Sequence, residues 1–172
     1  MLAETCFIMT SPVGRLLLHA SRERLTGLVI LADTGEPTVA AAVYAMAAVE
    51  RGHPVLQQAV EQLEQYFAGR RQAFRLPIEL SGLPAFTRKI LETLQSVPFG
   101  ETLTYGELAD RAGYPRAARA VGQVMAANPL PIIIPCHRVV AAGGRPGGYS
   151  GGGGVSTKEW LLAFERANHL AT

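Results

Sequence analysis

The 172-residue chain has only two cysteines, Cys6 and Cys136, too few for a disulfide scaffold or a four-cysteine zinc site. Its longest apolar runs, near Ala40–Val49 and at Ile132–Ile134, fall short of the roughly 20 residues that a membrane span needs. No basic start followed by a long apolar stretch opens the chain, so a signal peptide is not expected. Hydrophobic residues make up 48% and charged residues 17%, which excludes a disordered protein. We expect a cytoplasmic chain of one compact domain or two small ones.

Acidic residues are missing from one long stretch. The net charge is only +2. However, the segment from Arg111 to Lys158 contains no Asp or Glu, whereas it contains six Arg and Lys residues, the two end residues included. A basic stretch of this length suits an anionic partner such as nucleic acid. It is equally typical of a solvated surface whose acids lie elsewhere in the sequence.

The first third of the chain has the pattern of a small antiparallel sheet. Strands are predicted at Glu4–Thr10, Arg15–Ala20 and Thr26–Leu31, because each segment is short, apolar and bounded by turn residues. The Ala-rich segment Thr38–Glu50 is ambiguous. A helix is predicted to begin at Pro54 and end before Gly69, followed by an extended segment over 71–80.

The second half is mainly helical. We expect a domain boundary near Ser81–Pro84, dividing the chain into 1–82 and 83–172, and a helix from Pro84 that ends at Pro98. Tyr105–Ala127 has the pattern of two helices around a tight turn at Gly113, which is typical of a helix-turn-helix and also of an ordinary helical hairpin. The fold class is therefore α+β.

Eight glycines fall within the twelve residues Gly143–Gly154, here called the glycine loop. The composition suits a flexible linker, or a loop that folds closely over a ligand. A capping box is predicted after it, with Ser156 at the cap and Glu159 three residues later. We expect Trp160, Leu161 and Phe164 of the final helix to face inward.

Cys136 follows the apolar run Ile132–Ile134 and Pro135, so it lies where a core segment ends. Most lone cysteines are buried, inert thiols. Here His137 and Arg138 come next, and neighbouring cations and a base favour the thiolate. A direct contact between the adjacent Cys136 and His137 is awkward, so we expect a water bridge between them. Glu165 of the last helix could orient His137.

These motifs resemble those of the O6-alkylguanine-DNA alkyltransferases. The resemblance rests on Pro-Cys-His-Arg-Val at 135–139, Tyr-Gly-Glu-Leu-Ala at 105–109, Arg-Ala-Val-Gly at 119–122 and Gly-Tyr-Ser-Gly-Gly at 148–152. It covers about residues 86–165, with a looser match in the first half. It implies an N-terminal ribonuclease-H-like α/β domain and a C-terminal domain with a helix-turn-helix. After the last motif this chain runs two residues longer than many relatives, which affects the loop that covers the pocket.

The resemblance implies direct-reversal DNA repair, in which the alkyl group of a flipped-out O6-alkylguanine moves once and irreversibly to Cys136. His137 would be the water-linked base and Glu165 its partner. Tyr105 would help to rotate the base and would protonate the leaving guanine, and Asn128 would be the hinge between the recognition helix and the active site.

The same resemblance implies contacts with double-stranded DNA through the minor groove, and Arg119 would insert where the base has left. Further DNA-contacting positions would be Thr87, Tyr114, Ala117, Ala118, Gly122 and Ala142. The pocket would be formed by Met125, Val139, Tyr149 and Ser150.

No cofactor and no metal is expected, and the protein should act as a monomer. Cys6 and His19 alone do not make a zinc site. Two other functions stay open: a lesion-binding protein without transfer activity, and a cysteine hydrolase. A helix-turn-helix transcription factor is a further alternative, although its relatives carry an additional cysteine-rich domain. Whether O4-alkylthymine is also a substrate is left open.

Overall fold

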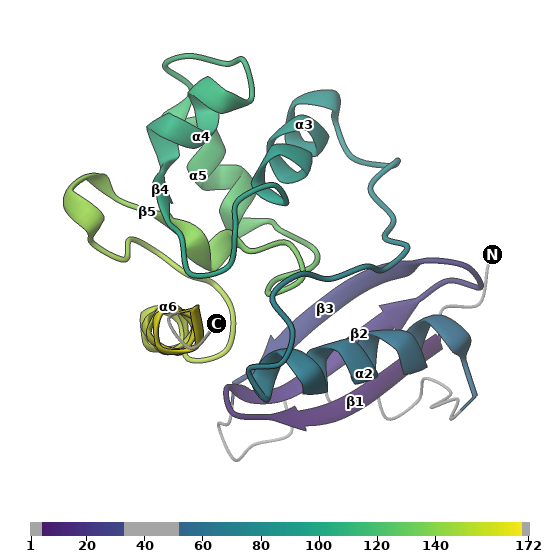
Figure 1. Cartoon of the computed structure of the whole chain (residues 1–172). Coiled ribbons are helices and arrows are strands. Elements are labelled where there is room, and N and C mark those ends of the chain that lie inside the picture. Colours follow the sequence, from purple (N-terminus) through teal and green to yellow (C-terminus); the bar gives the residue numbers. More distant parts are fainter. Residues whose placement is uncertain (1–4, 33–51, 170–172) are drawn as a thin grey trace. The chain divides into compact units, whose positions relative to one another are not determined.

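The computed structural model describes residues 5–32 and 52–169, so the ambiguous segment Thr38–Glu50 lies outside the described residues. The chain divides into two compact units, Met1–Glu79 and Leu80–Thr172 (Figure 1). The finer division into functional domains at 82 and 83 stays a prediction. The helices of the described residues are all too short or too polar to cross a membrane.

The first unit contains a three-stranded antiparallel sheet in the order β1-β2-β3. Its strands are β1 (Thr5–Ser11), β2 (Gly14–Ala20) and β3 (Leu25–Leu31), which confirms the three predicted strands to within one residue. Alternation sends Leu16 and Leu18 of β2 to one face, where they are fully buried. The helix α2 (Pro54–Phe67) packs on the sheet, as Figure 1 shows, and completes this core.

The ends of α2 follow from local sequence. Pro54 occupies the first turn, where its missing N–H costs no hydrogen bond. Gly69 has a φ of 71°, a left-handed conformation that glycine adopts without strain, and the helix stops before it. The predicted extended segment after α2 forms only one bridge to the sheet, between Ile78 and Leu25.

The second unit begins with α3 (Ala85–Leu94), which ends four residues before the predicted stop at Pro98. The chain turns after Leu94, and Val97 is buried in that turn rather than in the helix. Two short strands, β4 (Leu103–Thr104) and β5 (Val139–Val140), pair in parallel, although the 34 residues 105–138 lie between them in sequence. They bring the segment after Cys136 beside the start of the helix-turn-helix.

The helix-turn-helix is formed by α4 (Tyr105–Arg111) and α5 (Ala118–Ala126). Thr104 and Glu107 make a reciprocal capping box at the start of α4, with N–H to oxygen distances of 3.2 and 2.6 Å. Between the helices, Gly113 has a φ of 86°, which supplies the tight turn.

The last helix, α6 (Val155–His169), shows that the predicted capping box at Ser156 is wrong. Ser156 is already inside the helix, and its hydroxyl donates to the carbonyl of Gly153. Thr157 caps the preceding turn instead, since its Oγ1 accepts from the N–H of Gly153 at 2.9 Å. The inward orientation predicted for Trp160 is also wrong, because 37% of this residue is exposed.

Candidate active site

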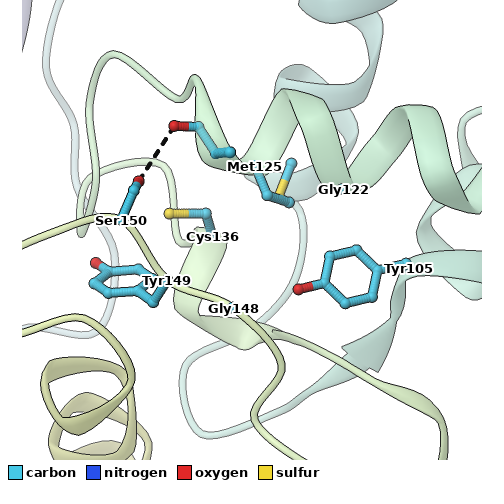
Figure 2. A pocket seen from close by; sticks show the side chains of 8 residues that line it. Tyr105, Gly122, Met125, Cys136, Gly148, Tyr149 and Ser150 are labelled. Atoms are coloured by element: carbon cyan, nitrogen blue, oxygen red, sulfur yellow. Dashed lines mark hydrogen bonds between the residues drawn. The ribbon is translucent and has the colours of Figure 1, made fainter.

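A cavity of about 400 Å³ opens in the second unit, within the range of about 300–1,000 Å³ typical of small-ligand sites. Its lining comes from α4, α5, the Cys136 turn and the glycine loop (Figure 2). The lining residues are Tyr105, Gly122, Met125, Ala126, Cys136, Gly148, Tyr149 and Ser150. Of the residues predicted for the pocket, Val139 is not among them: it is fully buried in β5.

Cys136 opens the short 3-10 helix η1 (Cys136–Arg138) and is only 5% exposed. Burial raises the pKa of its thiol, while Asn128, Lys158 and Tyr149 act in the opposite direction. The thiol is therefore protonated at rest, and reaction needs a group that takes the proton.

The segment that leads from α5 to Cys136 is tied together by Asn128. Its side chain donates to the carbonyl of Ile134 at 2.8 Å and accepts from the N–H of Leu130 at 3.0 Å. Within this segment the buried Ile132 has a φ of 73°, a strained conformation for a β-branched residue. Asn128 thus connects the end of α5 with the chain just before the nucleophile.

His137 and Glu165 form a fully buried pair, with 2.7 Å between His137 Nε2 and Glu165 Oε1. Burial opposes ionisation of Glu165, but hydrogen bonds from His137 and Arg138 hold the pKa of its carboxyl well below the ordinary value. Because an ionised carboxylate only accepts, Nε2 carries the hydrogen and Nδ1 keeps a free lone pair. Burial lowers the pKa of His137, so the ring is neutral. Among the described residues, the buried Nδ1 has no hydrogen-bond partner.

Arg138 points into the protein, although the sequence counted it in the basic stretch that suits an anionic partner. Its Nε and NH2 each lie 2.9 Å from an oxygen of Glu165, and its NH1 donates to the carbonyl of Val97 at 2.6 Å. The apolar residues that follow Arg138 in sequence were the available sign that it is buried. The sequence analysis named Arg138 as a cation next to Cys136 but missed its contact with Glu165.

Lys158 is a site residue that the sequence analysis missed, and it is only 1% exposed. Its ammonium donates to the carbonyls of Val139 at 2.6 Å and Gly148 at 3.2 Å, and it lies 5.8 Å from the centre of the Tyr105 ring. Helical spacing could have revealed it. Lys158 and Glu165 share the buried face of α6 with Leu161 and Leu162, at positions i, i+3, i+4 and i+7.

Two tyrosines from different elements border the cavity, as Figure 2 shows. Tyr105 is the first residue of α4, and Tyr149 lies in the glycine loop. Burial and Cys136 raise the pKa of both hydroxyls, so both are proton donors at neutral pH. Ser150 is tied to α5, since its hydroxyl donates to the carbonyl of Ala126 at 3.2 Å.

The residues predicted to contact DNA have varied positions. Arg119 is exposed on α5, and Tyr114 is 38% exposed in the turn before it, with its ring 4.8 Å from that of Phe86. The others are half-buried or exposed: Thr87 in α3, Ala117 and Ala118 at the start of α5, Gly122 at the cavity and Ala142 in the 3-10 helix η2 (Ala142–Gly144).

Within residues 5–32 and 52–169, no three His, Cys, Asp or Glu side chains come together in a way that could hold a metal ion. Beside the cavity lie Cys136, the pair of His137 and Glu165, and the two tyrosines. The set consists of a nucleophile, a proton acceptor and proton donors beside one cavity.

Comparisons with known proteins agree with this geometry. Residues 85–167 match the model of the 6-O-methylguanine DNA methyltransferase DNA-binding domain, and residues 6–80 match that of its ribonuclease-like domain. The methylated-DNA–protein-cysteine methyltransferase of Mycolicibacterium paratuberculosis is 41% identical over 94% of this chain and 92% of its own length. The human protein of the same name is also 41% identical, over 91% of this chain and 78% of its own.

Solved structures give the same result. The O6-methylguanine methyltransferase of Mycobacterium tuberculosis aligns with a TM-score of 0.81 at 38% identity, covering 96% of this chain and 94% of that one. A structure of the Mycobacterium tuberculosis protein in complex with DNA aligns with a TM-score of 0.79 at 38% identity, over 94% and 92% of the two chains. From its two matching domains and its close relatives, we conclude that this chain belongs to the O6-methylguanine-DNA methyltransferase family.

Proposed function

We propose that this protein repairs DNA by a single, irreversible transfer of the alkyl group of O6-alkylguanine to the thiol of Cys136. The observation that carries the proposal is the position of Cys136 in the wall of a cavity, next to a buried and neutral His137 that is oriented by Glu165. No cofactor is required, since the chain's own side chains supply the nucleophile and move the protons.

The reaction is a displacement at an sp3 carbon. A bond forms between the sulfur of Cys136 and the alkyl carbon while the bond from that carbon to O6 of guanine breaks. The thiol proton passes through a water molecule to Nδ1 of His137, and the hydroxyl of Tyr105 protonates the leaving guanine. His137 then releases its proton and Tyr105 regains one through solvent, so that the net change moves one proton from the thiol to guanine.

The target base must leave the DNA stack before it can enter the cavity, which costs a few kcal/mol. We propose that α5 enters the minor groove and that Arg119 fills the gap left by the base. The small side chains of Ala117, Ala118 and Gly122 would let the helix backbone approach the DNA. Thr87, Tyr114 and Ala142 would contact its backbone or groove, and Asn128 would couple α5 to the nucleophile.

The product is a thioether, which has no good leaving group, so each chain reacts once. We expect the protein to act as a monomer on double-stranded DNA. A protein with this substrate works on the chromosome, and we expect it in the cytoplasm, associated with the nucleoid.

The test of the reaction is incubation with a duplex that contains O6-methylguanine, followed by intact mass and peptide mapping. We expect one added methyl group per chain, on Cys136. The Cys136→Ser variant should bind the duplex but gain no mass, and the matched Cys6→Ser variant should react normally. Repeated turnover would indicate a hydrolase, and binding without added mass would indicate a lesion-binding protein; either result overturns the proposal.

The role of Arg119 can be separated from the chemistry. Arg119→Ala should slow repair in duplex DNA but hardly change the reaction with free O6-benzylguanine, which needs no flipping. Arg166→Ala, which removes an exposed arginine from α6, is the matched control and should change neither rate. Equal losses on both substrates in the Arg119 variant would contradict the proposed role.

A further inference from the structure

Arg138 makes contacts that hold it in one orientation. Three of its nitrogens donate to protein oxygens, two to Glu165 and one to the carbonyl of Val97. Its guanidinium also lies 5.8 Å from the centre of the Phe99 ring. With a side chain only 6% exposed, Arg138 cannot turn toward a bound DNA strand without breaking these contacts.

The carboxylate of Glu165 is consequently shared. Oε1 accepts from His137 and from NH2 of Arg138, and Oε2 accepts from Nε of Arg138 and from the N–H of Gly100 at 3.0 Å. These four donors use the whole acceptor capacity of the carboxylate. His137 and Arg138 can share it because they are neighbours on η1 and both point toward α6.

The charges around His137 decide whether its ring is neutral or protonated. Among residues 5–32 and 52–169, Glu165 is the negative group that acts on the ring, and the guanidinium of Arg138 lies against the same carboxylate and offsets its charge. Lys158 on α6 also acts on the ring and is positive. His169 lies against Gly100 at the exposed end of α6. Because Arg138 and Lys158 are both positive and Glu165 is the partner they share, a proton on His137 would add a second unbalanced positive charge to a buried cluster.

A buried histidine paired with a carboxylate alone would tend to be protonated rather than neutral. The carboxylate would retain a proton on the ring, as an ion pair, and a protonated ring cannot accept another proton. We propose that Arg138 is a positioning residue that keeps His137 neutral, and so able to accept the Cys136 proton, by balancing the charge of Glu165. This inference rests on the base role of His137 proposed above.

The experiment compares the pH dependence of alkyl transfer in the wild type, Arg138→Met and Arg138→Lys. In Arg138→Met, Lys158 is the remaining cation that opposes the effect of Glu165 on His137. The rate of alkyl transfer should then fall on the acidic side of the pH profile, and the acidic limb should move up by about one pH unit or more. The rate at pH 7 should drop about tenfold and recover to within about threefold by pH 9. Arg138→Lys retains the positive charge, and its acidic limb should stay close to that of the wild type. A loss by the same factor at every pH, or an equal shift in both variants, would overturn the proposal.

A second measurement does not depend on the variants folding. Nitrogen-15 NMR of the His137 ring in the wild type should show a neutral ring with hydrogen on Nε2 at pH 7, because burial lowers the pKa of His137. A protonated ring at pH 7 would overturn the inference. The rate of a His137→Asn variant reports separately on the base role: an undiminished rate would refute that role, whereas the NMR measurement still tests whether the His137 ring is neutral.

Discussion

Gly147 lies where an added methyl group would meet the side chain of Tyr105. Its φ is 72°, and a Cβ built at this position would lie 2.9 Å from the hydroxyl oxygen of Tyr105 and 3.4 Å from its Cε2. Gly143, in the same loop, has a φ of 80°, and a Cβ added there would meet no atom within 4 Å. Gly147→Ala and Gly143→Ala therefore both place a Cβ on a residue with a positive φ, but only Gly147→Ala creates a close contact with Tyr105.

The two effects can be given magnitudes. A left-handed conformation costs a residue with a Cβ about 1–2 kcal/mol, and in a chain of this size each kcal/mol lowers the melting temperature by about 2–4 °C. Both variants should thus melt about 2–8 °C below the wild type. Only Gly147→Ala must also displace the Tyr105 hydroxyl or the glycine loop by a few tenths of an ångström. Since misplacement by 1 Å can cost about a hundredfold in rate, we expect a loss of about tenfold, or 1.4 kcal/mol.

The assay is the second-order rate of alkyl transfer from O6-benzylguanine and from O6-methylguanine in duplex DNA, measured by intact mass beside thermal unfolding. Gly147→Ala should react slowly with both substrates, and more so with the bulkier benzyl group, because the cavity narrows. Gly143→Ala should lose stability without losing rate. Equal rates in the two variants would refute the reasoning, whether both match the wild type or both are impaired.

Three further predictions concern the buried polar groups. In the wild type, the free energy of unfolding should fall as the pH drops below 4.5, the ordinary pKa of Glu165, because the unfolded carboxyl takes up a proton before the folded one does. Urea unfolding at several acidic pH values should show this slope and its reduction in Glu165→Gln; identical slopes would contradict it. Asn128→Ala should lower the free energy of unfolding by about 1–3 kcal/mol and slow alkyl transfer, since it leaves two backbone groups unpaired and removes a donor to Cys136; unchanged urea midpoints would count against this. Lys158→Met should raise the pKa of Cys136 and reduce the transfer rate about tenfold at neutral pH, with partial recovery at higher pH; a pH-independent loss would indicate a purely structural role.

The sequence predicted the strands and helices whose ends are marked by residues next to them in the chain. The three strands were recognisable because turn residues bound each apolar segment, and α2 because Pro54 and Gly69 mark its ends. The helix-turn-helix followed from the small residues around Gly113. The predicted end of α3 and the predicted start of α6 were wrong. Hydrogen bonds with the adjoining turns determine where these helices end and begin, and the propensities of Pro98 and Ser156 do not determine it.

The site was predictable to the extent that motif residues touch one another. The pairing of His137 with Glu165 was expected and is present at 2.7 Å. The inward positions of Arg138 and Lys158 were not, because their partners are backbone carbonyls and a carboxylate brought near only by the fold. A charge count along the sequence assigns such residues to the surface, since it contains no information on which cations the tertiary structure buries.

Glu165 follows His137 by 28 positions in the sequence, and this separation has a consequence for the newly made protein. Synthesis proceeds from the N-terminus, so Cys136 and His137 leave the ribosome before the acid that orients the histidine. Until α6 forms and packs against η1, the thiol has no oriented base, and Arg138 has no carboxylate to balance. We therefore expect a growing chain to be unreactive toward alkylated guanine until α6 has packed against η1.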